Sequence, residues 1–158
     1  KPKLLQMEIY LQMPKFGENS KKHLNSCHED LQIIFNAVIV EIDCSVICGH
    51  RNEEDQEKAF NKGNSKVHFP KGKHNSNPST AVDVYPYPID FDDLPRFYWF
   101  AGWVLAKAEI LRNVGEITHN VRWGGNWDGF KKGIIDFSYN KRQDVLDDLP
   151  HFELKPND

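Results

Sequence analysis

One histidine and one aspartate lie in a short stretch of sequence that begins as a polar loop and continues as a predicted strand. His74 lies in a polar loop rich in Gly, Asn, Ser and Pro, and Asp83 lies in the alternating run AVDVY, which predicts a strand. A carboxylate between apolar neighbours needs a partner, because an unpaired buried charge is strongly destabilising. A metal ion shared with His74 would be such a partner. The alternative is a solvated loop followed by an edge strand with an exposed Asp83.

A second histidine follows a predicted turn near the end of the chain. Pro150 disfavours helical geometry in the residue before it, so residues 147–150 predict a turn leading into a strand. In that strand His151 and Glu153 share one face. Asp148 could stand beside a metal that His151 holds without being a ligand itself. The alternative is a partly buried strand histidine beside a turn aspartate.

Together these residues have the composition of a hydrolytic metal site. Two imidazoles, one carboxylate and an open fourth position are the ligand set of a catalytic zinc site. Zinc lowers the pKa of its bound water toward about 7 and polarises a carbonyl group. Asp148 could take the proton of that water and return it to a leaving amine.

The elements that must position these residues can be predicted from periodicity and capping. Apolar residues recur at three- and four-residue steps over residues 20–40, which predicts one amphipathic helix. Residues 45–48 predict a short strand. Asn52 caps a second helix with three acids in its first turn, and Gly63 ends it. Residues 1–12 fit either a short strand or a short helix.

The longest predicted helix follows Asp92 or Asp93, one of which caps it, and ends at Gly115. Its inward stripe consists of Phe97, Ala101, Val104, Ala108 and Leu111. Its other faces are apolar as well, so we expect it to be the central buried helix. Strands mixed with helices, without regular βαβ alternation, predict the α+β class. We expect a single domain over residues 1–158, with a small antiparallel sheet and flanking helices, since no linker would separate a second domain.

The composition excludes several classes of protein. A formal charge of -3 argues against nucleic-acid binding, since the Lys and Arg residues are scattered and the basic run at residues 71–74 is short. The longest apolar run, residues 97–106, is about half the length of a membrane span. The N-terminal residues lack the apolar region of a signal peptide. Cys27, Cys44 and Cys48 form no CxxC pair, and we expect small buried thiols.

Four segments in order resemble a known enzyme family. They are SKVHFPKGKHN at residues 65–75, PSTAVDVYPY at 78–87, WGGNW at 123–127 and DLPHFE at 148–153. This succession is similar to the M15 zinc peptidases, and most similar to the L-alanyl-D-glutamate endopeptidases of bacteriophage endolysins. The resemblance extends over residues 45–154. It implies the fold shared by Hedgehog and D,D-peptidase domains, zinc as cofactor, and peptidoglycan as partner.

The resemblance also implies a role for individual residues. The zinc ligands of the family correspond to His74, Asp83 and His151, and its general base corresponds to Asp148. The segment GHR at residues 49–51 followed by Gln56 resembles a family motif. It makes Arg51 a candidate for steadying an oxyanion or a substrate carboxylate. Gln56 becomes a candidate for binding substrate.

The family pattern is not matched everywhere. The family often has Ser where this chain has Gly72, and the interval from His74 to Asp83 is longer than in the shortest version of the motif. Trp127 could wall the cleft and bind substrate, although a place in an aromatic core fits equally well. The oxygen-rich residues 126–129 weakly resemble a calcium loop but lack its twelve-residue pattern.

The resemblance therefore implies a monomeric zinc endopeptidase, without a separate cell-wall-binding domain, that cleaves the L-Ala-D-Glu bond of peptidoglycan stem peptides. Such an endolysin would accumulate in the host cytoplasm and reach the cell wall at lysis. One rival is a D,D-carboxypeptidase or D-Ala-D-Ala dipeptidase on the same scaffold, for which export would be expected. The other rival is a binding module that holds zinc without catalysis, against which an intact Asp148 argues.

Overall fold

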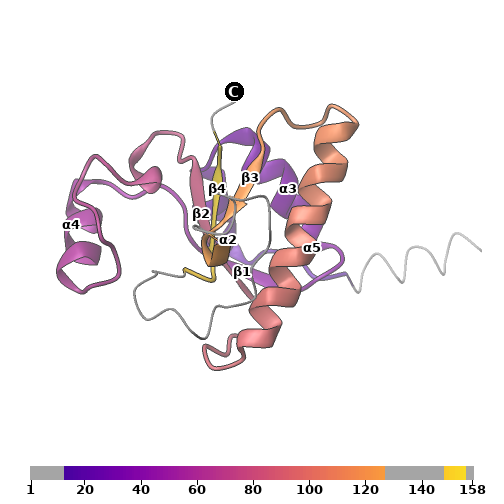
Figure 1. The fold of residues 1–158 in the computed structure, drawn as a ribbon, viewed down its shortest axis with the longest axis horizontal. Helices are drawn as coiled ribbons and strands as arrows, with labels where there is room; N and C mark the ends of the chain where they lie inside the picture. The colour runs from indigo at the N-terminus through magenta and orange to yellow at the C-terminus, as the bar shows by residue number, and fades with distance from the viewer. Residues whose placement is uncertain (1–12, 127–147, 156–158) are drawn as a thin grey trace, which may run out of the picture.

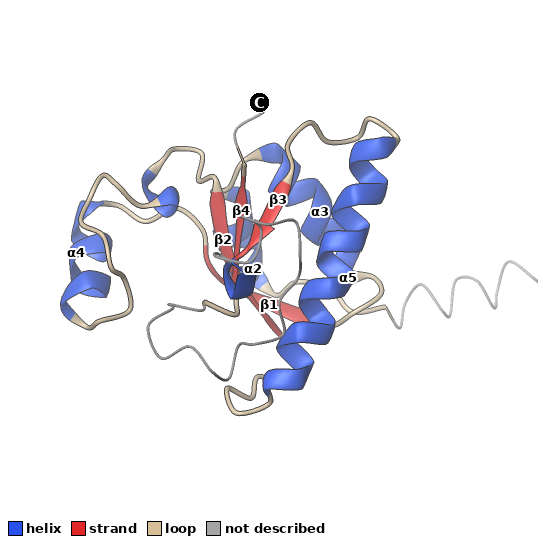
Figure 2. Cartoon of the chain, viewed as in Figure 1, coloured by secondary structure: helices blue, strands red, loops and turns tan. Residues whose placement is uncertain are grey.

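The fold is arranged on a sheet of four antiparallel strands in the order β1-β2-β4-β3. The computed structural model describes residues 13–126 and 148–155. The strands, red in Figure 2, are β1 (Cys44–Cys48), β2 (Ala81–Pro86), β3 (Val121–Trp123) and β4 (His151–Leu154). The last strand of the chain thus lies between β2 and β3. The predicted α+β class with a small antiparallel sheet is confirmed.

Helices lie on both sides of this sheet. They are α2 (Glu18–Asn25), α3 (Glu29–Ile39), α4 (Glu53–Asn61) and α5 (Leu94–Asn113), with the short turns η1 (Lys73–Asn75) and η2 (Gly124–Asn126). In Figure 1, α3 and α5 lie to one side of the sheet, whereas α4 stands apart on the other and a long loop joins it to η1. Within the described part of the chain, no helix is long and apolar enough to cross a bilayer.

The single helix predicted over residues 20–40 is wrong, because the chain leaves helical geometry between α2 and α3. There Ser26 accepts a hydrogen bond from the Ser79 amide at 2.9 Å, and the His28 amide donates to the Ser79 carbonyl at 2.8 Å. The His28 ring then caps α3 by accepting from the Asp30 amide at 3.1 Å. The apolar period continues across the break because both helices contribute to the same core.

The predicted ends of α4 and α5 are confirmed. The Asn52 side chain accepts from the Asp55 amide at 2.9 Å, which satisfies a donor that the helix leaves unpaired. Asp93 caps α5 in the same way. Gly63 and Gly115 follow the two helices with φ of 78° and 82°, a left-handed conformation that glycine adopts without steric cost.

The expectation that the longest helix is buried all round is wrong. Trp99 and Trp103 of α5 are 56% and 42% exposed. The buried residues of α5 form one stripe: Phe97, Phe100, Ala101, Val104 and Ala108. The predicted stripe residue Leu111 is only partly buried and packs against the edge of the core. The helix covers one face of the sheet, and its outer aromatic residues gave it the composition of a fully buried helix.

The core fixes the start of β4 through one phenylalanine. Phe152 is fully buried and packs edge to face against Phe35 of α3 and Phe100 of α5, with ring centroids 5.5 and 6.1 Å apart. Aromatic pairs of this geometry add to the stabilisation from burial. Because His151 precedes Phe152, the position of β4 in the core also sets the position of that histidine.

A buried carboxylate ties α3 to the loop before β3. One oxygen of Asp30 accepts four hydrogen bonds, from the amide and hydroxyl of Thr118 and from the amide and Nδ1 of His119, at 2.8–3.2 Å. Burial would raise the pKa of Asp30, but these hydrogen bonds hold it below the ordinary value of 3.8. The ionised carboxylate therefore stabilises the folded chain.

Replacing Asp30 by Ala should lower the free energy of unfolding by about 2–3 kcal/mol, because it leaves several donors without their acceptor. Since the pKa is lower in the folded than in the unfolded chain, the contribution is complete above about pH 4 and is lost as the pH falls through the folded value. Urea unfolding of both proteins over this pH range measures the effect. The exposed Asp43→Ala variant is the control, and an equal loss in it would contradict the role of Asp30.

Candidate metal centre and active site

The register of the sheet aligns three side chains that could bind a metal. Asp83 of β2 is paired with Cys48 of β1 on one side and with His151 of β4 on the other. Directly opposed residues of antiparallel strands place their side chains next to each other. His74 joins them from η1, which is anchored by a 2.8 Å hydrogen bond from the Arg51 amide to the His74 carbonyl.

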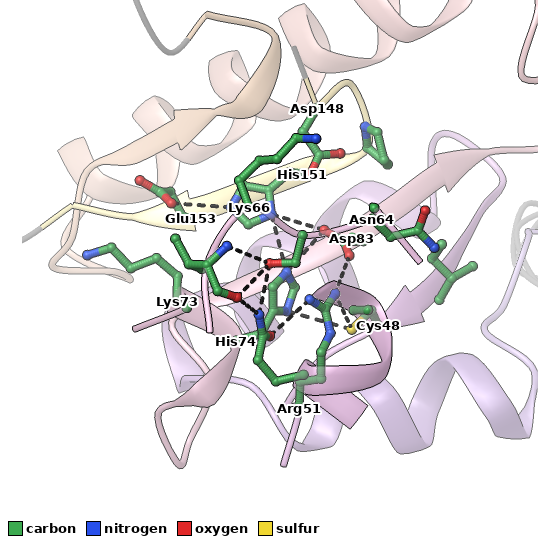
Figure 3. A pocket seen from close by; sticks show the side chains of 18 of the residues that line it. Cys48, Arg51, Asn64, Lys66, Lys73, His74, Asp83, Asp148, His151 and Glu153 are labelled. Atoms are coloured by element: carbon green, nitrogen blue, oxygen red, sulfur yellow. Dashed lines mark hydrogen bonds and ion pairs between the residues drawn. The ribbon is translucent and has the colours of Figure 1, made fainter. Parts of the chain in front are cut away.

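Three atoms of the predicted ligands meet at one point. His74 Nε2 lies 3.2 Å from Asp83 Oδ1 and 3.2 Å from His151 Nδ1, and the last two atoms are 3.0 Å apart. All three residues are buried or nearly so. Figure 3 shows their side chains pointing toward one another at the base of a pocket. The structure thus brings together the three residues that sequence reasoning selected from distant parts of the chain.

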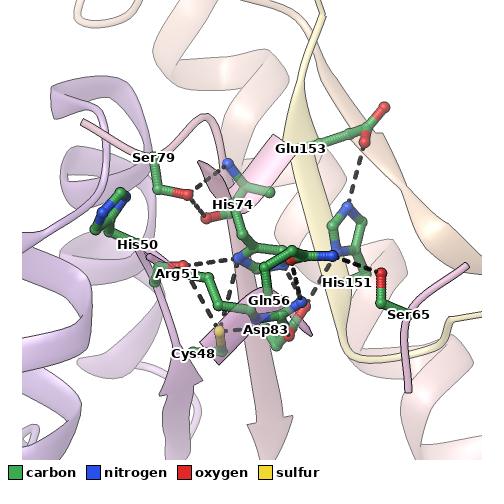
Figure 4. Close-up of polar contacts among 12 residues, drawn as sticks. Cys48, His50, Arg51, Gln56, Ser65, His74, Ser79, Asp83, His151 and Glu153 are labelled. Carbon is green, nitrogen blue, oxygen red and sulfur yellow. Dashed lines mark hydrogen bonds and ion pairs between the residues drawn. The ribbon is translucent and has the colours of Figure 1, made fainter. Parts of the chain in front are cut away.

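Each of the two histidines has a further hydrogen-bond partner on the far side of its ring. His74 Nδ1 lies 2.8 Å from the Gly49 carbonyl, and His151 Nε2 lies 3.2 Å from a Glu153 oxygen (Figure 4). Carbonyl and ionised carboxylate oxygens only accept, so these two ring nitrogens carry the protons. In a neutral histidine the other ring nitrogen then carries the lone pair. Both imidazoles therefore direct lone pairs toward Asp83 Oδ1.

A cation is the species that stabilises this arrangement. Without one, three electron pairs lie about 3 Å apart with no positive charge between them. A proton can serve in part: burial alone would lower the pKa of His74, but the charge and hydrogen bond of Asp83 raise it to about 10. Burial would likewise raise the pKa of Asp83, and the two histidines lower it. A metal ion would satisfy all three groups at once and would compete with protons for them.

Cys48 offers an alternative ligand set with His74 and Asp83. Its sulfur lies 3.7 Å from His74 Nδ1, the nitrogen already bonded to Gly49. Arg51 Nη2 lies 3.2 Å from the same sulfur and 3.3 Å from Asp83 Oδ2. A metal on this side would be next to a guanidinium charge. The geometry favours the set with His151.

The prediction of small buried thiols holds for two of the three cysteines. Cys27 and Cys44 are buried and free, and burial raises the pKa of each to about 12. Cys48 is half-buried and lines the cleft, so for this residue the prediction is wrong. Its position at the end of β1 takes it out of the core and next to Arg51.

Gln56 uses its whole side chain inside the protein. Its oxygen accepts from Arg51 Nη1 at 3.3 Å and from Asn75 Nδ2 at 3.2 Å. Its nitrogen donates to Ser65 Oγ at 2.8 Å and to the Val67 carbonyl at 2.6 Å. Gln56 is 1% exposed and its hydrogen-bonding capacity is filled. This arrangement fits a residue that positions Arg51 and the loop better than one that binds substrate.

Arg51 and Asp148 both line the cleft above the three converging atoms. Arg51 is held by contacts with Asp83 and Gln56, which leaves its guanidinium at a fixed place. A carboxylate oxygen of Asp148 lies within 4.8 Å of ligand atoms of Asp83 and His151. Burial and the charge of Asp83 raise the pKa of Asp148, while neighbouring cations oppose that rise. Asp148 is thus close enough to act either on a reacting water or as a ligand.

Close packing against Gly124 sets the turn that carries Asp148. The Asp148 amide donates to the Gly124 carbonyl at 3.2 Å, and the His151 amide donates to the Asp148 carbonyl at 3.1 Å, as the predicted turn requires. A Cβ at position 124 would clash with the Asp148 carbonyl and meet His151 Cβ at 3.0 Å. Glycine therefore lets η2 approach the two residues.

Of the two tryptophans near the glycine-rich loop, the structure describes Trp123 but not Trp127. Trp123 is buried, and its Nε1 donates to the Leu149 carbonyl at 2.7 Å, so it belongs to the core beneath the turn. Trp127 and residues 128–129 of the suggested calcium loop lie outside the described residues. Their assignment stays a prediction.

A second cluster of possible ligands, His28, Asp30 and His119, is explained without a metal. Their ligand atoms lie within 4.8 Å of one another. However, His28 Nδ1 accepts the hydrogen bond that caps α3, and one Asp30 oxygen accepts the four bonds described above. The cluster already serves as a structural clasp.

Comparisons with known proteins agree with this fold and give the family of the chain. Residues 13–155 match the family of phage L-alanyl-D-glutamate peptidases, and the chain belongs to that family. It is therefore a peptidase. The fold is similar to that of the Serratia marcescens L-Ala D-Glu endopeptidase ChiX, with a TM-score of 0.64, 23% sequence identity and 92% of each chain covered. No curated protein sequence matches the chain.

The two alternative ligand sets make different predictions for metal binding. Replacing His151 by Ala should abolish stoichiometric zinc binding, whereas Cys48→Ser should retain it. Glu153→Gln should weaken binding by roughly 10–100-fold, because Glu153 orients the His151 ring. Zinc content after dialysis, followed by competition with a chelating dye, measures all three. If Cys48→Ser loses zinc while His151→Ala keeps it, the metal lies on the other side of Asp83.

Proposed function

We propose that this protein is a zinc-dependent endopeptidase that cleaves the L-Ala-D-Glu bond in the stem peptide of bacterial peptidoglycan. The observation that carries the proposal is the convergence of His74 Nε2, Asp83 Oδ1 and His151 Nδ1 at the base of an open cleft. Membership of the phage L-alanyl-D-glutamate peptidase family supports the bond and the substrate.

The donor set fits zinc in both chemistry and spacing. Ligands placed tetrahedrally at about 2.0–2.1 Å from zinc lie about 3.3 Å from one another. The three donor atoms here are 3.0–3.2 Å apart. Two imidazole nitrogens favour zinc over calcium or magnesium, which prefer oxygen ligands. Glu153 behind His151 and the Gly49 carbonyl behind His74 are the outer partners that such sites usually have.

The residues of the cleft divide the chemistry between them. Zinc, when bound, supplies a Lewis acid that polarises the scissile carbonyl and acidifies water. We assign to the Asp148 carboxylate the removal of a proton from the attacking water and its delivery to the leaving amine. Arg51, fixed by Asp83 and Gln56, can donate to the oxygen on which negative charge develops. The burial of Asp148 supports this role, since it moves the pKa toward the working pH of a general base.

We further propose a setting for this activity. Family membership supports a phage endolysin that is made in the cytoplasm of the infected cell and acts on the wall at lysis. We take the chain as one catalytic domain that works as a monomer. Sedimentation of the active protein would test its monomeric state.

The function is tested on purified muropeptides by mass spectrometry, with and without a chelator. We expect a peptide product with a new N-terminal D-glutamate, no product after chelation, and recovery when zinc is restored. Release of free D-alanine would instead indicate the carboxypeptidase activity of the rival prediction. If the zinc-loaded protein left the muropeptides intact, the remaining interpretation would be a binding module that holds zinc without catalysis.

Replacing Asp148 by Asn separates holding the metal from using it. The amide keeps the shape of the carboxylate but cannot accept a proton, so turnover should fall by about 10²–10⁴-fold while zinc content and fold are retained. Turnover of muropeptides and zinc content are measured on the same preparations, with the exposed Asp43→Asn variant as control. Near-normal turnover would move the base role to another residue, Glu153 first. Loss of zinc would make Asp148 a ligand.

A further inference from the structure

Both charged and apolar side chains line the cleft above the three converging atoms. It encloses about 790 Å³. The loop between α4 and η1 contributes Lys66 and Lys71, and the first residue of η1 contributes Lys73; these three lysines are here called the lysine wall. The cleft is also lined by the apolar groups of Ile47, Tyr85 and Phe91. Lys66 and Lys73 are labelled in Figure 3 among the residues that line the pocket together with His74, Asp83 and His151.

The lysine wall carries charge that the described part of the protein does not neutralise. All three lysines are exposed, and none forms an ion pair with another described residue. Three lysines elsewhere on the protein are paired: Lys21, Lys58 and Lys107 each lie 2.6–2.9 Å from a glutamate oxygen.

Two of the three acids that line the cleft, Asp83 and Glu153, have close partners other than the lysines, and Asp148 is the third. Lys73 acts on Glu153 only at longer range, where its charge helps to lower the pKa of that carboxyl group. Asp83 contacts Arg51 at 3.3 Å, and Glu153 contacts His151 at 3.2 Å and Arg122 at 3.6 Å. Among the described residues, Lys66 and Lys71 therefore present positive charge to whatever enters the cleft.

The loop that carries the lysines is held in place by α4. Gln56 donates to Ser65 Oγ and to the Val67 carbonyl, on either side of Lys66. The Glu57 carboxylate bonds to the His68 ring at 2.8 Å and to the Phe69 amide at 3.0 Å. Positive charges on an anchored loop are preorganised for an anionic group, so less ordering entropy is lost on binding.

We propose that the lysine wall selects stem peptides whose D-glutamyl α-carboxyl group is a free carboxylate over those in which it is a carboxamide. The inference rests on the proposed function, because it places that peptide in the cleft. A D-glutamyl residue linked onward through its γ-carboxyl keeps its α-carboxyl free, next to the scissile bond. Ammonium groups attract a carboxylate, whereas a carboxamide of the same shape has no net charge. Ile47, Tyr85 and Phe91 can contact the uncharged part of the peptide.

The test uses two synthetic stem peptides that differ only in this group, carboxylate or carboxamide. Exposed ion pairs contribute up to about 1 kcal/mol each, so the wild-type kcat/KM should favour the carboxylate peptide by roughly 5–10-fold. In Lys66→Gln/Lys71→Gln the preference should fall toward unity through a higher KM, with kcat retained. Lys73 is left unchanged because it precedes His74. The preference should also shrink with added salt, as the Debye length falls from about 10 Å to about 3 Å.

The paired Lys58→Gln is the matched control on the same part of the chain, and it should keep the wild-type preference. Equal cleavage of both peptides by the wild type, or an unchanged preference in the double variant, would overturn the inference. Affinities of both peptides for Asp148→Asn test the lysine wall without turnover. A carboxylate preference there that disappears when Lys66 and Lys71 are also replaced supports the inference, and equal affinities refute it. If the wild type cuts neither peptide, the proposed function fails separately.

Discussion

Electrostatic repulsion among three converging electron pairs is the constraint on which the rest of the site depends. His74 and His151 each have one nitrogen committed to an outer acceptor, which leaves the other nitrogen facing Asp83 Oδ1. Such a group is stable in a buried place only with a cation among its members. The fold holds the group rigidly: the strand register sets Asp83 beside His151, and the packing of Phe152 fixes β4. The rigid arrangement is thus prepared for an ion before the ion arrives.

Hydrogen bonds around the site also hold Arg51 and the loop of the lysine wall in fixed positions. Gln56 links the guanidinium of Arg51 to the loop that forms the lysine wall, so one buried side chain aligns a charge in the active site with one wall of the cleft. The two ends of this network differ in exposure. Arg51 is mostly buried, whereas Lys66 is free to meet a ligand from solvent. Catalysis and selectivity can therefore depend on different residues of a single hydrogen-bonded unit.

Local signals in the sequence predicted most of the elements, and tertiary contacts account for the failures. Asn52 and Gly63 predicted the ends of α4 because capping and left-handed geometry depend on adjacent residues. The break between α2 and α3 depends on Ser79, which is far away in sequence, and periodicity does not include such partners. Trp99 and Trp103 were misjudged because composition does not tell which face of an apolar helix meets solvent.

The convergence of His74, Asp83 and His151 could be predicted because each lay in a segment with its own strong pattern, and family resemblance joined the segments. The inward direction of the Gln56 side chain could not be predicted. The spacing of Gln56 from Arg51 in the sequence indicates that the two are close, but not which groups the Gln56 amide bonds. The lysine wall had a signal in the short basic run at residues 71–74, but only the fold shows that Lys66 lies on the same side of the cleft.

The central claim is tested most directly by X-ray absorption at the zinc edge of the zinc-loaded full chain. The account predicts a first shell of nitrogen and oxygen only, at about 2.0–2.1 Å, with the outer-shell scattering of two imidazole rings. A sulfur scatterer at about 2.3 Å would place Cys48 on the metal and contradict the assignment of His74, Asp83 and His151 as the ligand set.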